Sequence, residues 1–342
     1  MDVGLVTLGD WLPDPTTGQR LTQRARLRQI VDLAVLAESC GFSTFHVGEH
    51  HFSDYIVSSP AVMLAAMAER TTALRLSTAV TLLAHQDVVR VAEDHGTLDV
   101  LSDGRAELIV GRGVYEDHYR YFTGTWETSE AMLVQGVALL RELWSSTEVC
   151  WSGSIRARLD GVTVQPRPIQ RPHPPIWLSA SSPSSVERAV TLGCPIMIAT
   201  ISTGVALSAR LAAMYREGWR RAGRDPDDGL VGLHVHAYVG AGTTAEARRS
   251  WAPYQQGYLE WVLRDVRGHA GALPPALEVS DRSDAQAVCG DADDVVDELG
   301  RRIEAMGGVD RLLVQCDQGG LAPAEAAASI ERFARLVVPR LR

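Results

Sequence analysis

Short apolar runs alternate with longer segments of helical periodicity along this chain of 342 residues. The strand-like runs are residues 3–9, 42–47, 74–83, 106–110, 176–180, 195–199, 230–239 and 311–316. Helical spacing follows over 22–40, 60–70, 88–101, 128–144, 184–192, 205–222, 244–264 and 323–338, with a further helix over 291–306. Eight strand-then-helix units predict an α/β fold, the closed parallel TIM (β/α)8 barrel, as one domain over residues 1–342. A doubly wound open sheet is the weaker alternative, because no nucleotide-binding fingerprint follows the first strand.

Two segments interrupt this alternation. Residues 147–174 contain Trp151, two glycines and a proline cluster, and we expect an inserted hairpin or long loop at one end of the barrel. Residues 265–290 are polar and contain several glycines and prolines. A loop of this length in a compact domain is usually an active-site lid or disordered, so we expect a lid loop there.

Composition excludes several classes of protein. The net charge of −9 argues against a nucleic-acid partner. The chain has no lysine, which excludes a lysine Schiff base and a P-loop lysine. Its five cysteines are scattered and form no C-x-x-C pair, which indicates reduced thiols in a cytoplasmic protein. We read no signal peptide at the N-terminus, and the longest apolar runs are far too short for a membrane span.

Three titratable side chains follow the strand 42–47 directly: Glu49, His50 and His51. The carboxyl ends of parallel strands carry the chemistry of α/β barrels, and histidine is the side chain that titrates near neutrality. We therefore expect a functional role for this group, although a single histidine would more often only cap the strand. Neighbouring side chains on an extended stretch point to opposite faces, so one histidine aims into the barrel mouth, and spacing does not say which.

A second candidate site combines the ends of the strands 106–110 and 176–180. Arg112 stands between two glycines, a setting in which a guanidinium meets a phosphate or carboxylate. The serines at 181, 182, 184 and 185 surround Pro183 at a predicted helix start, where free amides and hydroxyls bind phosphate. Strands 106–110 and 176–180 are neighbours in the predicted barrel, so Arg112 and these serines are expected to clamp one phosphate. A surface turn and ordinary helix capping are the alternatives.

Two further patterns suggest sites that we do not favour. Residues 240–245 resemble a dinucleotide fingerprint, but no acidic residue is apparent at the next strand end, and we interpret them as a turn and helix cap. His234 and His236 share a strand face and with His50 or His51 suggest a metal-dependent hydrolase, but no further Asp or His at an obvious strand end completes a ligand set. We therefore assign no metal ligand.

The order of motifs along nearly the whole chain resembles that of the bacterial luciferase-like, flavin-dependent monooxygenases, most closely the catalytic luciferase subunit. The matching residues are Gly41-Phe42, Glu49-His50-His51-Phe52, Arg90 with Ala92-Glu93-Asp94, Ser102 with Gly104-Arg105, Arg112-Gly113 with Tyr115, the strand 176–180 with its serine turn, and Gly193 with Pro195.

The resemblance implies specific roles for these residues. His50 is similar to the catalytic histidine, with Glu49 or His51 tuning it. Arg112 is similar to the arginine that grips the flavin phosphate, Ser182 and Ser185 are similar to phosphate-binding hydroxyls, and Ser181 stands where luciferases have a glutamate. Ala79-Val80 matches a strand-end pair with a non-proline cis peptide beneath the flavin ring, and Tyr115 falls at a flavin-side position.

By the same resemblance, the implied function is that of a two-component monooxygenase. Reduced FMN, supplied by a separate NAD(P)H:flavin reductase, would react with O2 to a flavin hydroperoxide and transfer one oxygen atom to a small organic substrate. The resemblance also implies a homodimer. Gly111 replaces the reactive cysteine of luciferases and the 265–290 segment matches their lid weakly, which puts light emission and an aldehyde substrate in doubt. A deazaflavin-dependent hydride-transfer enzyme and a non-catalytic flavin-binding subunit are the alternatives.

Overall fold

Eight parallel strands close into a barrel in the computed structural model, which describes residues 1–122, 124–266 and 287–341. Around the barrel they are β1 (Asp2–Thr7), β2 (Thr44–Val47), β3 (Arg75–Leu82), β4 (Ala106–Gly111), β7 (Ile176–Ser179), β8 (Ile196–Ala199), β9 (Val231–Val239) and β11 (Arg311–Gln315). The barrel closes because β9 pairs with β8 on one side and with β11 on the other. The predicted TIM barrel is confirmed.

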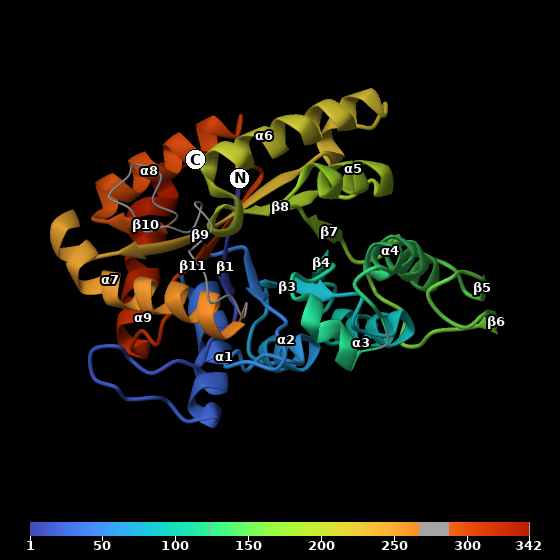
Figure 1. Ribbon diagram of the computed structural model, residues 1–342, viewed down its shortest axis with the longest axis horizontal. Helices are drawn as coiled ribbons and strands as arrows, with labels where there is room; N and C mark the ends of the chain where they lie inside the picture. Colours follow the sequence, from blue (N-terminus) through green and yellow to red (C-terminus); the bar gives the residue numbers. More distant parts are fainter. Residues whose placement is uncertain (123, 267–286, 342) are drawn as a thin grey trace.

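Helices surround the barrel in the order of the chain (Figure 1). They are α1 (Gln23–Ser39), α2 (Pro60–Ala68), α3 (Val88–Leu101), α4 (Ser129–Ser145), α5 (Pro183–Leu192), α6 (Thr200–Arg221), α7 (Thr244–Trp261), α8 (Ala292–Ala305) and α9 (Pro323–Arg332). Alternate side chains of each strand pack outward against these helices, as Leu108 and Val110 of β4 do. Between them, Ile109 packs inside the barrel with Trp177 of β7 and Met197 of β8.

Local capping chemistry sets several helix boundaries where the sequence predicts them. The Thr22 hydroxyl accepts a hydrogen bond from the Ala25 amide at the start of α1, and Gly41 follows its end at φ 80°. Thr243 and Glu246 form a capping box at the start of α7, so the glycine-rich residues before it are a turn and cap, as predicted.

The insertion between α4 and β7 forms the predicted hairpin. β5 (Val149–Trp151) and β6 (Leu159–Val162) pair antiparallel, apart from the barrel sheet, and project at the right edge of Figure 1.

The prediction of a continuous loop over 265–290 is wrong at its C-terminal end. Ala287–Gly290 is a strand, β10, which pairs parallel with residues His236–Val239 of β9. β9 is longer than β8, and its N-terminal half already pairs with β8, so its C-terminal half has an open edge for β10. Only four residues take part, too few for a periodic signal in the sequence. Residues 267–286 of the predicted lid lie outside the described residues.

Two predicted helices contain irregular turns. The helix predicted from 205 begins at Thr200, but Gly204 at φ 69° interrupts it, so the regular part starts where the sequence predicts. The helix predicted over 323–338 is regular to Arg332 and continues as a wider π turn over Phe333–Val337. No helix among residues 1–122, 124–266 and 287–341 is both long and apolar enough to cross a bilayer.

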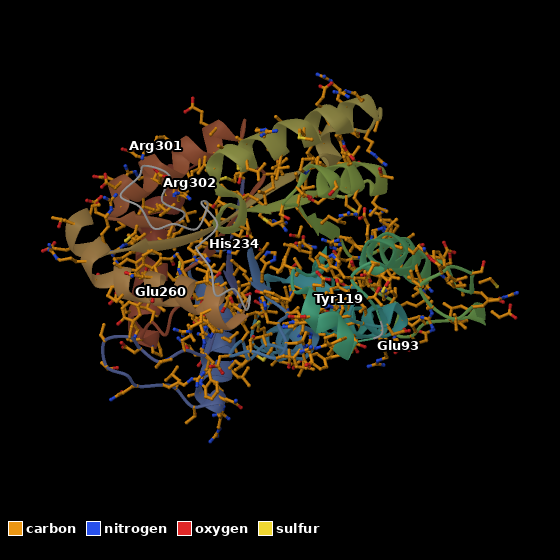
Figure 2. The ribbon with its side chains drawn as sticks, viewed as in Figure 1. Glu93, Tyr119, His234, Glu260, Arg301 and Arg302 are labelled. Atoms are coloured by element: carbon orange, nitrogen blue, oxygen red, sulfur yellow. The ribbon has the colours of Figure 1, made fainter. Side chains whose placement is uncertain are left out.

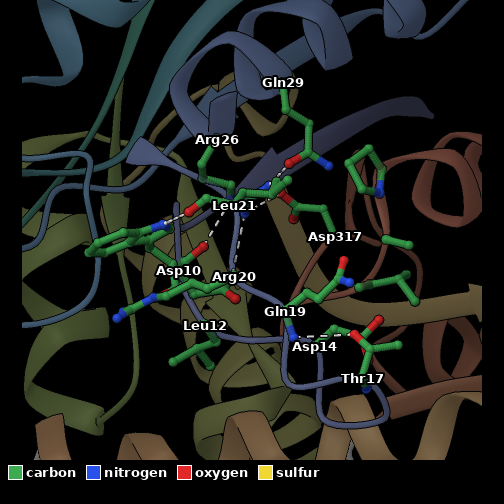
Figure 3. A pocket seen from close by; sticks show the side chains of 15 residues that line it. Asp10, Leu12, Asp14, Thr17, Gln19, Arg20, Leu21, Arg26, Gln29 and Asp317 are labelled. Atoms are coloured by element: carbon green, nitrogen blue, oxygen red, sulfur yellow. Dashed lines mark hydrogen bonds and ion pairs between the residues drawn. The ribbon is translucent and has the colours of Figure 1, made fainter. Parts of the chain in front are cut away.

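A buried arginine joins α1 to the carboxyl ends of β1 and β11. The Arg26 guanidinium donates to Asp317 Oδ2 at 2.8 Å and to the Asp10 carbonyl, and it lies 3.6 Å from the Asp10 carboxylate. Thr7 also donates to Asp317. Burial raises the pKa of Asp10 to about 6, against the opposing effect of Arg26. Figure 3 shows this group at a cavity of about 200 Å³ beside the loop after β1.

We predict that Arg26→Met lowers the free energy of unfolding by about 3–5 kcal/mol, because two buried carboxylates lose their counter-ion. Arg70→Met is the matched control: Arg70 pairs with Asp32 at the surface, where an ion pair contributes about 0–1 kcal/mol. Urea unfolding of both variants is the measurement. A loss at Arg26 no larger than the loss at Arg70 would contradict this account.

Candidate active site

The residues predicted to act together lie in or directly after β2, β3, β4 and β7, four consecutive strands of the barrel. Because the strands are parallel, their carboxyl ends meet at one face of the barrel. Glu49, His50 and His51 follow β2, Ala79 and Val80 lie in the second half of β3, and Arg112 follows β4. The fold therefore gathers residues from distant parts of the sequence at one end.

Glu49 connects the end of β2 to the end of β3. Its carboxylate is buried and accepts hydrogen bonds from three donors: the Leu82 amide at 2.9 Å, the Gln86 side chain at 2.8 Å, and His51 Nε2 at 2.9 Å. Every donor comes from the strand ends that carry the site. Glu49 is therefore a brace of the site and holds His51 in place.

His50 and His51 point to different neighbours, as alternation along an extended stretch predicts. The half-buried His50 ring stacks on Tyr55, with 3.9 Å between ring centroids and 22° between planes. It lies 6.3 Å from Tyr115. The His51 ring lies instead 6.1 Å from His85 and 4.9 Å from Phe122. Of the two, His50 faces Tyr115, the side chain that the resemblance places beside the flavin.

Tyr55, which the sequence analysis missed, fixes the plane of the His50 ring. Its hydroxyl lies 2.7 Å from that of Tyr258 on α7, and its ring packs edge-on against Trp261, 4.7 Å away. The Asp10 backbone forms an isolated bridge with Tyr55, which ties the loop after β2 to the end of β1. The only sequence signal for this role is an aromatic residue five positions after His50, and that pattern is too common to indicate a function.

His50 and His85 are held in the neutral form. Burial, together with His51 and His118, lowers the pKa of His50 to about 3. The same three causes lower the pKa of His85 to about 4. Both ring nitrogens of His85 are buried without a hydrogen-bond partner, and its ring stacks on Phe122 at 4.5 Å and 6°. Protonation of these rings is therefore unfavourable at pH 7.

The peptide bond between Ala79 and Val80 is cis, as the resemblance implies. A glycine packs on each side of this pair. A side chain at Gly48 would come within 2.8 Å of Leu8 and 3.4 Å of the Ala79 carbonyl, and one at Gly111 would come within 2.8 Å of Val80. Gly111, which stands where luciferases have a cysteine, therefore leaves room for Val80.

Arg112 presents its charge at the end of β4. Its guanidinium lies over the Trp126 ring, 3.9 Å from the centroid, and no carboxylate of the described residues lies within ion-pair distance of it. The Tyr119 hydroxyl donates to the Arg112 carbonyl, which fixes the backbone. β4 pairs with β7, so the helix that follows β7 starts beside this strand. The Arg112 guanidinium and the start of this helix together form a site suited to binding an anion.

The serine-rich turn after β7 caps α5 with more than one hydroxyl. Ser182 accepts from the Ser185 amide, and Ser185 Oγ accepts from the amides of Ser181 and Ser182, both at 3.0 Å. The hydroxyl oxygens of Ser182 and Ser184 lie 3.0 Å apart. The hydroxyls predicted to bind phosphate thus also order the helix start, and contact between them and a phosphate stays a prediction.

The remaining candidates lie around this centre or inside the barrel. Tyr115 lies 4.9 Å from His118, measured between ring centroids. His234, labelled in Figure 2, and His236 face the same side of β9, with 5.9 Å between their rings. His236 is bound to Gln255 of α7. Within the part of the chain that the structure describes, no three His, Cys, Asp or Glu side chains are arranged to hold a metal ion.

Comparison with known proteins gives a match over most of the chain. The family model described as luciferase-like monooxygenase matches residues 1–318. The oxygenase component of flavin-dependent trigonelline monooxygenase from Acinetobacter baylyi is 24% identical over 339 residues, 93% of this chain and 91% of that protein. The matches to the first two curated relatives span only 51% and 62% of their length.

Solved structures agree with this match. The monooxygenase RslO1 from Streptomyces bottropensis is 26% identical and superposes with a TM-score of 0.86, covering 100% of both chains. An F420-dependent secondary alcohol dehydrogenase is 20% identical with a TM-score of 0.76, covering 100% of this chain and 99% of that one. At that identity the second likeness shows the fold alone.

We predict that Glu49→Gln destabilises the protein by about 1–3 kcal/mol, because an amide replaces an acceptor-only group that receives three hydrogen bonds, and at least one buried donor loses its partner. The matched control is Glu304→Gln on the exposed side of α8, with an expected change within about 0.5 kcal/mol. Thermal and urea unfolding measure both. Equal stability of the two variants would show that Glu49 is not a brace.

The lowered histidine pKa values predict acid sensitivity. A histidine with a folded-state pKa below its unfolded value of about 6.5 contributes stability that is present above pH 6.5 and lost as the pH falls towards the folded value. For His85 this window runs from about pH 6.5 down to about 4. Between pH 7.5 and 5, His85→Phe should therefore lose roughly 1–2 kcal/mol less stability than the wild type. Parallel pH dependences in urea unfolding would contradict a buried neutral His85.

Proposed function

Because the chain belongs to the luciferase-like monooxygenase family, a family of enzymes, we propose that it is the oxygenase component of a two-component flavin monooxygenase. It would use reduced FMN and O2 to transfer one oxygen atom to a small organic substrate. The observation that carries the proposal is an arginine without a carboxylate partner among the described residues, Arg112. It stands one barrel strand from a capped helix start and two strands from a neutral histidine.

The residues present fit a flavin phosphate. Arg112 offers a charge with no described carboxylate within ion-pair distance, and the first turn of α5 offers serine hydroxyls and the positive end of a helix. We assign Arg112, Ser181, Ser182 and Ser185 to the phosphate, and Ala79, Val80 and Tyr115 to the flavin ring. Bound reduced flavin supplies the electrons and the oxygen activation, and the protein supplies orientation and a site with little water.

His50 is the residue we assign to proton transfer. Burial keeps the His50 ring neutral at pH 7, with one N–H donor and one nitrogen lone pair, and its stacking on Tyr55 holds the ring at a fixed orientation. His51 acts through its electrostatic effect on His50, and Glu49 acts by holding His51. Only His50 is proposed to contact the reacting atoms.

The proposal includes partners outside this chain. The trigonelline relative is named as an oxygenase component, which supports a separate NAD(P)H:flavin reductase as the source of reduced FMN. A homodimer and a cytoplasmic location are also part of the proposal, and both stay predictions.

One observation supports the deazaflavin-dependent alternative: the same barrel fold occurs in an F420-dependent enzyme. An enzyme of that class transfers a hydride and consumes no oxygen. FMN is preferred because the relative that aligns over 93% of the chain is a flavin-dependent monooxygenase.

The test is anaerobic titration of the protein with reduced FMN, followed by mixing with air. We expect binding, and reoxidation of the bound flavin at a rate different from that of free FMN. In His50→Ala, FMN should still bind but reoxidise at a changed rate, whereas Arg112→Met should weaken FMN binding about tenfold or more, the worth of a charge-assisted hydrogen bond. Binding of F420 without binding of FMN would overturn the proposal in favour of hydride transfer.

A further inference from the structure

A second arginine lies near the proposed phosphate site, in a position that the sequence motifs do not identify. Arg188, on the second turn of α5, pairs with Glu130 on the first turn of α4, with 2.6 Å between Nη2 and Oε1. Arg188, and at longer range Arg112, lower the pKa of the Glu130 carboxyl. One carboxylate therefore lies within the electrostatic reach of both arginines, which come from different elements.

The two members of the ion pair differ in burial. The Arg188 side chain is 10% exposed and its Nε is buried without a hydrogen-bond partner, whereas the Glu130 side chain is 57% exposed. Arg188 is held by its surroundings and has an unused donor. Glu130 is free to rotate into solvent, because more than half of its side chain already lies there.

The helix directs Arg188 towards the serine turn. Side chains of an α-helix lean towards its N-terminus, and residues three and four apart share a face. Arg188 therefore shares a face with Ser184 and Ser185 of the first turn. The serine turn follows β7, beside the end of β4 that carries Arg112. These relations place a second guanidinium on the side of the proposed phosphate.

We propose that Arg188 is a second phosphate-binding arginine and that Glu130 is a counter-ion which the flavin phosphate displaces. This inference rests on the proposed function and adds two residues to the same site. Without a ligand, the positive charges of Arg112 and Arg188 are offset in part by Glu130. A phosphomonoester carries about −1.5 to −2 charges near neutral pH, which the two arginines match once Glu130 turns away.

The alternative is that the pair only braces α4 against α5. If the pair is only a brace, its loss lowers stability and does not weaken the binding of FMN more than the binding of riboflavin. Riboflavin separates the two cases, because it has the ring system of FMN and lacks the phosphate.

The experiment compares the affinities of reduced FMN and reduced riboflavin, measured anaerobically by calorimetry, for the wild type, for Arg112→Met and for three further variants. Arg188→Met should bind FMN about tenfold more weakly, the worth of a charge-assisted hydrogen bond, with riboflavin changed less than twofold. Glu130→Gln should bind FMN about threefold more tightly at low salt, and screening should reduce this gain at high salt. Arg158→Met, at an exposed position on the β5–β6 hairpin, is the control and should match the wild type.

Each outcome decides a separate question. No FMN binding by the wild type would contradict the proposed function itself. If FMN binds and Arg112→Met weakens it while Arg188→Met does not, the inference alone fails. Weaker FMN binding in Glu130→Gln would show that Glu130 positions Arg188 and does not compete with phosphate, which also overturns the inference. If Arg188→Met unfolds, as its thermal melt would reveal, the sign of the change in Glu130→Gln still decides.

Discussion

The closed parallel barrel is the constraint on which the rest of this molecule depends. Each strand's carboxyl end lies at the same face, so residues 49–51, 79–80, 112 and 181–185 meet there although they are far apart in the sequence. Hydrogen bonds between adjacent strands fix this face. The site therefore needs little support of its own beyond side chains that orient the loops.

Two buried carboxylates provide much of that support in different ways. Glu49 accepts three hydrogen bonds, from the last residue of β3 and from the loops after β2 and β3, so it fixes the loop that carries the histidines. Asp317 is held by Arg26 and Thr7, which joins β11, α1 and β1 at the same end of the barrel. Both groups depend on these partners, because a buried carboxylate without partners is strongly destabilising.

Periodicity and strand-end logic predicted the barrel, the hairpin, the helix caps and the pairing of β4 with β7, the strands that precede Arg112 and the serine turn. Long elements carry enough repeats to be read, whereas the four-residue β10 does not, and it forms because β9 extends beyond β8. The role of Tyr55 was not predictable, since it arises from a contact with Tyr258 more than 200 positions away. Arg188 was missed for a similar reason: its partner Glu130 lies on another helix.

The central claim is that this face of the barrel binds a flavin with its phosphate at Arg112 and its ring near His50. A crystal structure of the protein with FMN tests this claim most directly. The account predicts the phosphate in contact with Arg112 and the first turn of α5, and the flavin ring against Ala79 and Val80. A phosphate bound elsewhere, with Arg112 still over Trp126 and without a ligand, would contradict it.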